Sequence, residues 1–246
     1  MTSPLDRQSM PNTRRTLWVP LAIGVVVVAL WNTPLVYPPK VLTVMLHEMC
    51  HALATLVTGG EVQEIKTQWD ESGHTLSRGG WAWVIYPAGY LGTALLGAVA
   101  ISIRRPATQR AYMIVLGAAY TLLNVLYGDW RALDFWVGVG TGAVLVGLSF
   151  AAEWLCDAAF NLLGIVLCLY SVHDVTSDLL GAQVAQTDAG LLARHWHADW
   201  LARPIGLVWV LASLGLLGWA VWRRLRLDAT AGRFGSPERH AGAGLP

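Results

Sequence analysis

A series of long apolar runs constrains this chain more than any other feature of its sequence. Runs that are long enough, or nearly long enough, to cross a bilayer lie at about residues 17–36, 41–58, 81–103, 111–128, 135–152, 154–172 and 205–222. Of the 246 residues, 54% are hydrophobic and only 13% are charged, which is typical of membrane proteins and not of soluble domains. Because a helix satisfies its own backbone groups in lipid, we predict an all-α polytopic membrane protein with six or seven transmembrane helices.

The segments outside these runs define the expected domain organisation. Residues 1–16 are predicted to be a cytoplasmic N-terminal tail, and residues 17–222 a single membrane-embedded domain. Residues 173–203 are predicted to be a polar loop within that domain, and residues 223–246, rich in Gly, Ala and Arg, a disordered C-terminal tail. Loops rich in arginine usually lie on the cytoplasmic side of a membrane. The arginines near several run ends cannot all be cytoplasmic if seven runs span, so the sequence leaves the orientation open.

Residues 59–80 differ from the apolar runs on either side. Polar and apolar residues alternate there around a Glu-Ser-Gly turn, which indicates a β-hairpin. An exposed strand edge can bind an extended peptide by main-chain pairing, so Glu61, Val62 and Ile65 are candidate substrate-binding residues. The alternative is a hairpin that only connects two helices.

One apolar run carries the motif His47-Glu48-Met49-Cys50-His51. Two histidines four apart project from one face of a helix, so both can bind one zinc ion, and the glutamate is placed to accept a proton from water. A charged group at the centre of a bilayer costs about 2.5–3.5 kcal/mol on insertion scales, so these polar groups need compensation. We therefore predict one Zn²⁺ bound by His47 and His51, with Glu48 as the catalytic general base.

A third protein ligand is expected, because catalytic zinc normally has three and keeps one position for water. Asp174 is the first candidate and Asp178 the alternative, since both close the sixth apolar run and stand four apart on one helix face. Asp188, His173 and His195 are weaker candidates.

Other polar residues and the overall charge narrow the function further. Tyr90 and Asn124 could donate hydrogen bonds to an oxyanion or to substrate, although helix packing is the alternative for each. Three cysteines in apolar stretches form no CxxC pair and are expected to be free thiols, namely Cys50, Cys156 and Cys168. The formal net charge of +1 gives no reason to expect a nucleic-acid partner.

Several segments resemble the shorter, B-like branch of the site-2 protease family of intramembrane zinc metalloproteases. They are LHEMCHALA at 46–54, TGG at 58–60, DESGHTLSRG at 70–79, PAGYLG at 87–92, and the later segments 169–179 and 187–189. The resemblance implies zinc, cleavage of peptide bonds in or near the membrane, and an aspartate as third ligand. Better-studied members carry that ligand in an Asn-Pro-x-x-Asp-Gly type motif, which this chain lacks, so Asp174 is inferred from its position.

Motif, membrane context and resemblance together predict a zinc-dependent intramembrane endopeptidase that acts on membrane proteins or peptides within the lipid bilayer. We expect a multi-pass integral membrane protein, in the plasma membrane if the source is prokaryotic. The sequence leaves open whether the protein forms a homo-oligomer. One alternative is a catalytically silent protein that binds a metal or a partner, against which the intact Glu48 argues. Another is a metal or proton transporter, although no internal repeat typical of transporters is present.

Overall fold

The structure is a computed structural model that describes residues 22–67 and 72–234. The predicted N-terminal tail, residues 1–16, lies outside the described residues, as does the part of the predicted C-terminal tail at 235–246.

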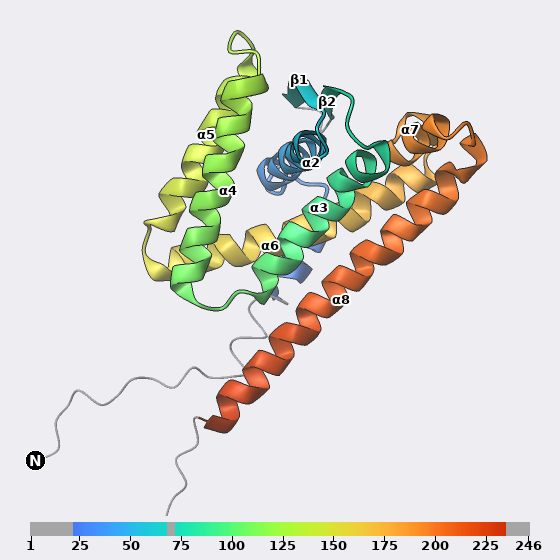
Figure 1. Cartoon of the computed structure of the whole chain (residues 1–246). Helices are drawn as coiled ribbons and strands as arrows, with labels where there is room; N and C mark the ends of the chain where they lie inside the picture. The colour runs from blue at the N-terminus through green and yellow to red at the C-terminus, as the bar shows by residue number, and fades with distance from the viewer. Residues whose placement is uncertain (1–21, 68–71, 235–246) are drawn as a thin grey trace, which may run out of the picture.

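The described residues form mainly long helices (Figure 1). After a helical stretch at 22–29, these are α2 (Tyr37–Val57), α3 (Ala82–Ser102), α4 (Pro106–Tyr127), α5 (Leu133–Ser149), α6 (Glu153–Leu180), α7 (Asp188–His195) and α8 (Ala202–Phe234). Five segments are long and apolar enough to cross a membrane: α2, α3, α4, α6 and Asp199–Leu227, which contains most of α8. The apolar part of α5, Phe135–Ser149, is shorter. The predicted class, a helical polytopic membrane protein, is confirmed.

Strands β1 (Glu61–Thr67) and β2 (Gly73–Arg78) form the predicted antiparallel hairpin after α2. Ile65 pairs with Thr75, and the register shifts between Val62 and Glu64. Both strands pack against α2. The chain enters and leaves the hairpin through glycines with positive φ, 79° at Gly59 and 72° at Gly79, a conformation that side chains other than glycine rarely adopt.

The segment predicted as a polar loop, residues 173–203, is largely helical. Helix α6 continues to Leu180, and α7 lies between two short 3₁₀ turns, Val184–Gln186 and Asp199–Leu201. Helix α7 forms because its apolar side chains find a partner surface: Ala189 and Leu192 are buried in a cluster with Tyr90 of α3 and Trp209 of α8. Helix α7 has only eight residues, and an apolar pattern this short does not distinguish an amphipathic helix from a loop.

Helix α8 continues to Phe234, so residues 223–234 do not form the predicted disordered tail. Side chains along this part of the helix explain the extension. Arg224 is buried and donates a hydrogen bond to the Asn161 side chain, with 2.9 Å between Nη1 and Oδ1. Arg226 lies over the ring of Trp222, 4.2 Å from its centroid.

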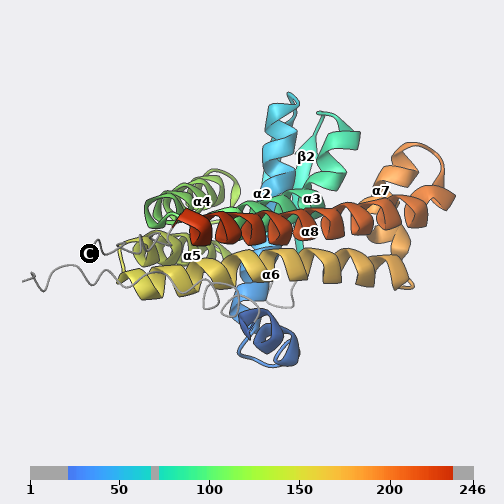
Figure 2. The ribbon, with the colours of Figure 1, turned by 90° about the horizontal axis from the view of Figure 1, so that it is seen from below.

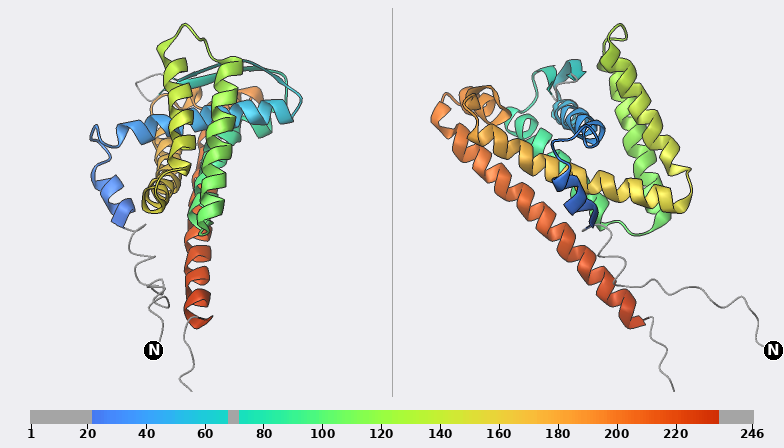
Figure 3. Two further views of the ribbon diagram at one scale, coloured as in Figure 1. Left: turned by 90° about the vertical axis from the view of Figure 1, so that its left-hand side faces the viewer. Right: turned by 180° about the vertical axis from the view of Figure 1, so that it is seen from behind.

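Helix α2 lies in the middle of the molecule. It packs against α3, α6 and both strands, and it runs across α6 and α8 when the molecule is seen from below (Figure 2). Helices α4 and α5 lie side by side at one flank, and α8 extends along the other (Figure 3). The largest core cluster joins α2 to α4 and α6 through residues such as Leu46, Met113 and Phe160. This places the motif of α2 among several helices.

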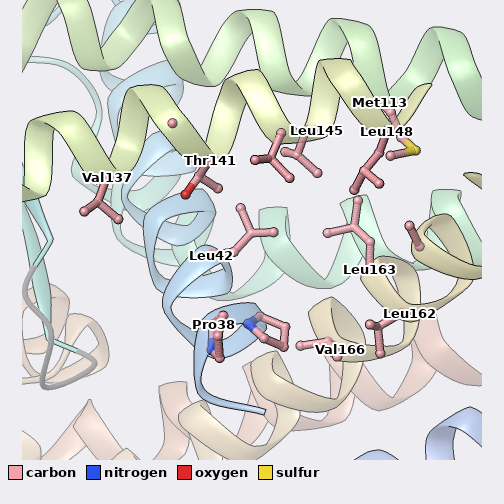
Figure 4. A pocket seen from close by; sticks show the side chains of 14 residues that line it. Pro38, Leu42, Met113, Val137, Thr141, Leu145, Leu148, Leu162, Leu163 and Val166 are labelled. Atoms are coloured by element: carbon pink, nitrogen blue, oxygen red, sulfur yellow. The ribbon is translucent and has the colours of Figure 1, made fainter. Parts of the chain in front are cut away.

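An apolar pocket of about 410 Å³ lies beside the N-terminal half of α2 (Figure 4). Pro38 and Leu42 line it from α2, while other lining residues come from α4, α5 and α6. Thr141 contributes a hydroxyl group to a lining that is otherwise apolar. Helix α2 therefore has an apolar environment at its start and, as described next, a polar one further along.

Candidate metal centre

Helix α2 brings the two motif histidines together. His47 and His51 stand one turn apart, with 3.0 Å between their Nε2 atoms and an edge-to-face ring arrangement. The turn is deeply buried, since Glu48 is 5% and His51 6% exposed. An unbroken helix fixes the spacing of these side chains, so the predicted pairing of the two histidines is present in the structure.

Asp188, the first residue of α7, completes the group. Its Oδ2 atom lies 3.1 Å from Nε2 of His47 and 3.1 Å from Nε2 of His51. Among the described residues, these three form the group of His, Cys, Asp and Glu side chains that can hold a metal ion. Asp188 is 141 residues from His47 and 137 residues from His51 in the sequence.

The start of α7 is fixed locally, which sets the position of Asp188. Thr187 is the N-cap, and its Oγ1 accepts a hydrogen bond from the backbone N–H of Gly190 at 3.3 Å. Gly190 lies against the preceding turn so closely that a Cβ atom there would stand 2.1 Å from the Val184 carbonyl oxygen. Capping and this close approach hold the carboxylate toward α2.

The chemistry of the three donor atoms fits a metal ion. His51 Nδ1 lies 2.7 Å from the carbonyl oxygen of Ile85, a contact in which the ring nitrogen donates. In the neutral ring, Nε2 then carries a lone pair, which faces the Oδ2 atom of Asp188. Ligand atoms on one tetrahedral zinc ion stand about 3.3 Å apart, close to the separations seen here. Such facing lone pairs call for a shared cation, either a proton or a metal ion.

The electrostatics of Asp188 depend on the same two histidines. Burial alone would raise the pKa of its carboxyl group. The attraction of His51 and the hydrogen-bonding contacts with both histidines outweigh burial and hold that pKa below its usual range. Asp188 is therefore ionised, which is the form that binds a metal.

Helix α3 approaches the histidines at a glycine. A Cβ atom on Gly89 would lie 2.3 Å from Nε2 of His47 and 2.4 Å from Nε2 of His51. Any larger side chain would therefore displace the candidate ligands. This gives a physical reason for a glycine in the Pro-Ala-Gly-Tyr segment at 87–90.

Tyr90, the next residue of α3, links the site to Asp178. Its hydroxyl group donates a hydrogen bond to the Asp178 carboxylate, and its ring packs edge-on against His47 with 4.6 Å between centroids. Tyr90 therefore supports His47 from the side. Asp178, the predicted alternative ligand, engages Tyr90 and is not part of the metal-binding group.

The expectation for Asp174 also differs from the structure. Asp174 is half-buried on α6 and is not part of the candidate metal group, and α6 continues for another six residues before the chain turns. The turn brings residue 188 to the histidines instead. Of the other weaker candidates, His173 packs against Trp31 and His195 is exposed at the end of α7.

Glu48 points to the hairpin side of α2. Thr75 of β2 donates to it, with 2.8 Å between Oγ1 and the carboxylate Oε2. On β1, Glu61 is exposed, Val62 is buried and Ile65 packs against the main core.

Asn124 belongs to another part of the molecule. Its Nδ2 donates to the Tyr120 hydroxyl group at 2.9 Å, and it lies against Gly138 of α5. The helix-packing alternative therefore describes its contacts.

Asp188, only a weaker candidate by its place in the sequence, does carry a sequence signal. The Thr187-Asp188 pair is a typical helix start, with an N-cap threonine followed by an acidic residue. It also lies in the segment 187–189 that resembles the protease branch. The spacing along the chain gave no means of ranking it above Asp174.

Comparison with known proteins adds one finding. The sequence model of the Peptidase M50B-like family matches residues 20–220, a range that includes α2, α7 and the hairpin. No curated protein and no solved structure matches the chain.

Proposed function

Because the chain belongs to the Peptidase M50B-like family, we propose that it is a zinc-dependent intramembrane endopeptidase. The observation that carries the proposal is the group of His47, His51 and Asp188, whose ligand atoms lie 3.0–3.1 Å apart. Two of these residues belong to a helix apolar enough to cross a membrane. Buried polar groups in such a helix call for a partner, and a metal ion is one.

In this proposal His47, His51 and Asp188 hold the ion, and Asp188 takes the place first expected for Asp174. A zinc ion bound by two imidazoles and a carboxylate would acidify water and polarise a peptide carbonyl group. The Ile85 carbonyl, which accepts from His51, orients that ring and leaves Nε2 to bind the ion when it is present. Tyr90 packs against His47 and restricts its ring in the same way.

Glu48 is the proposed general base. It accepts a proton from the attacking water and returns it to the leaving amine when the peptide bond breaks. Its burial, with 5% of the residue exposed, keeps competing bulk water away from the carboxylate. A protein that only bound a metal would have no use for this residue.

The proposed substrate is a segment of a membrane protein or peptide. Peptide bonds in a helix are shielded by their own hydrogen bonds, so the segment must unwind before cleavage. Once extended, it can pair with the hairpin, where the main chain at Glu61, Val62 and Ile65 would contribute hydrogen bonds and the exposed Glu61 side chain a further contact. We place the protein in a cellular membrane as a multi-pass protein, the plasma membrane in a prokaryote.

The test uses the purified full-length chain in detergent. Wild type, Glu48→Gln and a control variant, Glu153→Gln at the exposed start of α6, are assayed for bound zinc and for cleavage of a panel of single-span substrates. We expect zinc in all three and cleavage in all but Glu48→Gln. Absence of zinc from every preparation, or cleavage by Glu48→Gln at the wild-type rate, would contradict the proposal.

A further inference from the structure

Strand β2 covers the carboxylate of Glu48 with two of its residues. The hydroxyl oxygen of Thr75 lies 2.8 Å from Oε2 and 3.0 Å from the backbone oxygen of Glu48. Two residues earlier, a Cβ atom on Gly73 would lie 2.9 Å from both Cγ and Oε1 of Glu48. Residues two apart on a strand face the same side, so β2 presents one face to this side chain.

The two contacts have different consequences. Gly73 supplies no side chain, which leaves space for the carboxylate between β2 and α2. Thr75 supplies one proton, and an ionised carboxylate is a stronger acceptor for it than a backbone carbonyl group that already belongs to a helix. Oε2 is thus the oxygen that Thr75 holds, and Oε1 lies against Gly73 without that bond.

We propose that Thr75 is a positioning residue for Glu48: its hydroxyl group fixes Oε2 and so holds the carboxylate in the orientation in which it takes a proton from the reacting water. This inference rests on the proposed role of Glu48 as general base. A glutamate side chain has several rotatable bonds, and a base must be held within a fraction of an ångström of its productive position. The hydrogen bond from a strand packed on α2 supplies that restraint.

The position of Thr75 in the hairpin also links the restraint on Glu48 to the proposed substrate-binding strand. Thr75 pairs with Ile65 of β1, one of the residues proposed to contact substrate. The same two-stranded unit therefore touches the base on one side and offers its strands to an extended peptide. The hairpin contributes to the chemical step as well as to substrate contact.

The experiment compares three variants of the full-length protein with wild type, using a synthetic single-span peptide as substrate. Thr75→Val removes the hydroxyl group, and Thr75→Ser keeps it. Thr121→Val is the matched control, since it removes a half-buried hydroxyl group that bonds only within α4, to the Gly117 carbonyl. The values measured are kcat, KM, zinc content and the thermal unfolding midpoint.

We expect Thr75→Val to lower kcat by about tenfold, as is usual when an outer partner of a catalytic group is removed. KM and zinc content should stay at the wild-type values, Thr75→Ser should recover most of kcat, and Thr121→Val should match wild type. If Thr75→Val does not fold, Thr75→Ala is used in its place, because it removes the same hydroxyl group without adding a methyl group.

Three results would overturn the positioning role: an unchanged kcat in Thr75→Val, a loss in Thr75→Ser as large as in Thr75→Val, or a loss that appears in KM or zinc content alone. The last would indicate a role in packing or substrate contact. Glu48→Gln in the same assay separates this outcome from failure of the proposed function. If Glu48→Gln is inactive while Thr75→Val is not, only the positioning role is lost; if Glu48→Gln is fully active, both are.

Discussion

The two halves of the candidate metal site are built in different ways. The histidines come from α2, a helix of 21 residues in the middle of the molecule, where Leu46 and Ala52 have no exposed surface. Asp188 comes from α7, which has eight residues and is joined to its neighbours by 3₁₀ turns. The first half is set by the geometry of one helix, and the second by how a short helix docks.

This difference has an energetic consequence. After a substitution in the α2 half, the helix cannot shift to restore the site, because a close-packed core surrounds it. A change in the support of α7 can be absorbed by a small shift of that helix. We therefore expect the largest effects on zinc binding from α2 and the helix that touches it, and the smallest from the cap of α7.

Removal of either histidine should have the largest effect. His47→Ala and His51→Ala are each expected to lose stoichiometric zinc and all measurable cleavage, because a site with two remaining ligands holds the metal weakly. Zinc analysis of the purified variants is the measurement, with His195→Ala, an exposed residue of α7, as control. Stoichiometric zinc in either α2 variant would contradict the expectation that the α2 half dominates zinc binding.

Gly89→Ala tests how closely α3 supports the α2 half. The added methyl group would meet both Nε2 atoms, so we expect a lower zinc affinity and a large loss of cleavage. Gly97→Ala, on the same helix as Gly89, is the matched control, since its methyl group would stand 2.7 Å from Sγ of Cys168 on α6, away from the histidines. The control should lose thermal stability and keep zinc; equal zinc loss in both variants would point to general destabilisation.

Tyr90→Phe should have an intermediate effect. The change removes the hydrogen bond to Asp178 but keeps the ring against His47, so zinc is expected to be retained. Loss of a hydrogen bond to the half-buried Asp178 carboxylate should lower the free energy of unfolding by about 1–3 kcal/mol. Denaturant unfolding checks this value.

Tyr112→Phe provides the comparison for that experiment, because its hydroxyl group donates to the Leu96 carbonyl at 2.9 Å in another part of the helices. We expect cleavage to fall several-fold in Tyr90→Phe and to stay near wild type in Tyr112→Phe. Zinc loss in Tyr90→Phe would mean that Asp178 and Tyr90 belong to the ligand set after all.

The smallest effect is expected at the cap of α7. Thr187→Ala removes the side-chain bond to the Gly190 N–H and should lower the free energy of unfolding by about 1 kcal/mol. Zinc affinity should fall only slightly, because α7 keeps its packing on Tyr90 and Trp209. Thr187→Ser retains a capping oxygen and should match wild type in a zinc titration. A loss of zinc affinity in Thr187→Ala as large as that in His51→Ala would show that α7 is as constrained as α2.

The same contrast explains which features the sequence predicts. The residues His47, Glu48 and His51 follow from a spacing that a helix converts directly into geometry. The approximate positions of α2 to α6 and of the hairpin follow from apolar length and alternation, which depend on local sequence. Asp188 could not be ranked above Asp174, because its position depends on where α6 ends and how α7 packs. Beyond residue 223, α8 likewise makes a contact that the sequence does not reveal, between Arg224 and Asn161 of α6.

The most direct test of the proposed site is a comparison of bound zinc in Asp188→Ala and Asp174→Ala, each purified as the full chain in detergent beside wild type. Asp188→Ala should lose zinc and cleavage, whereas Asp174→Ala should keep one zinc ion per chain and remain active. Zinc lost from Asp174→Ala and retained by Asp188→Ala would contradict the assignment of the third ligand.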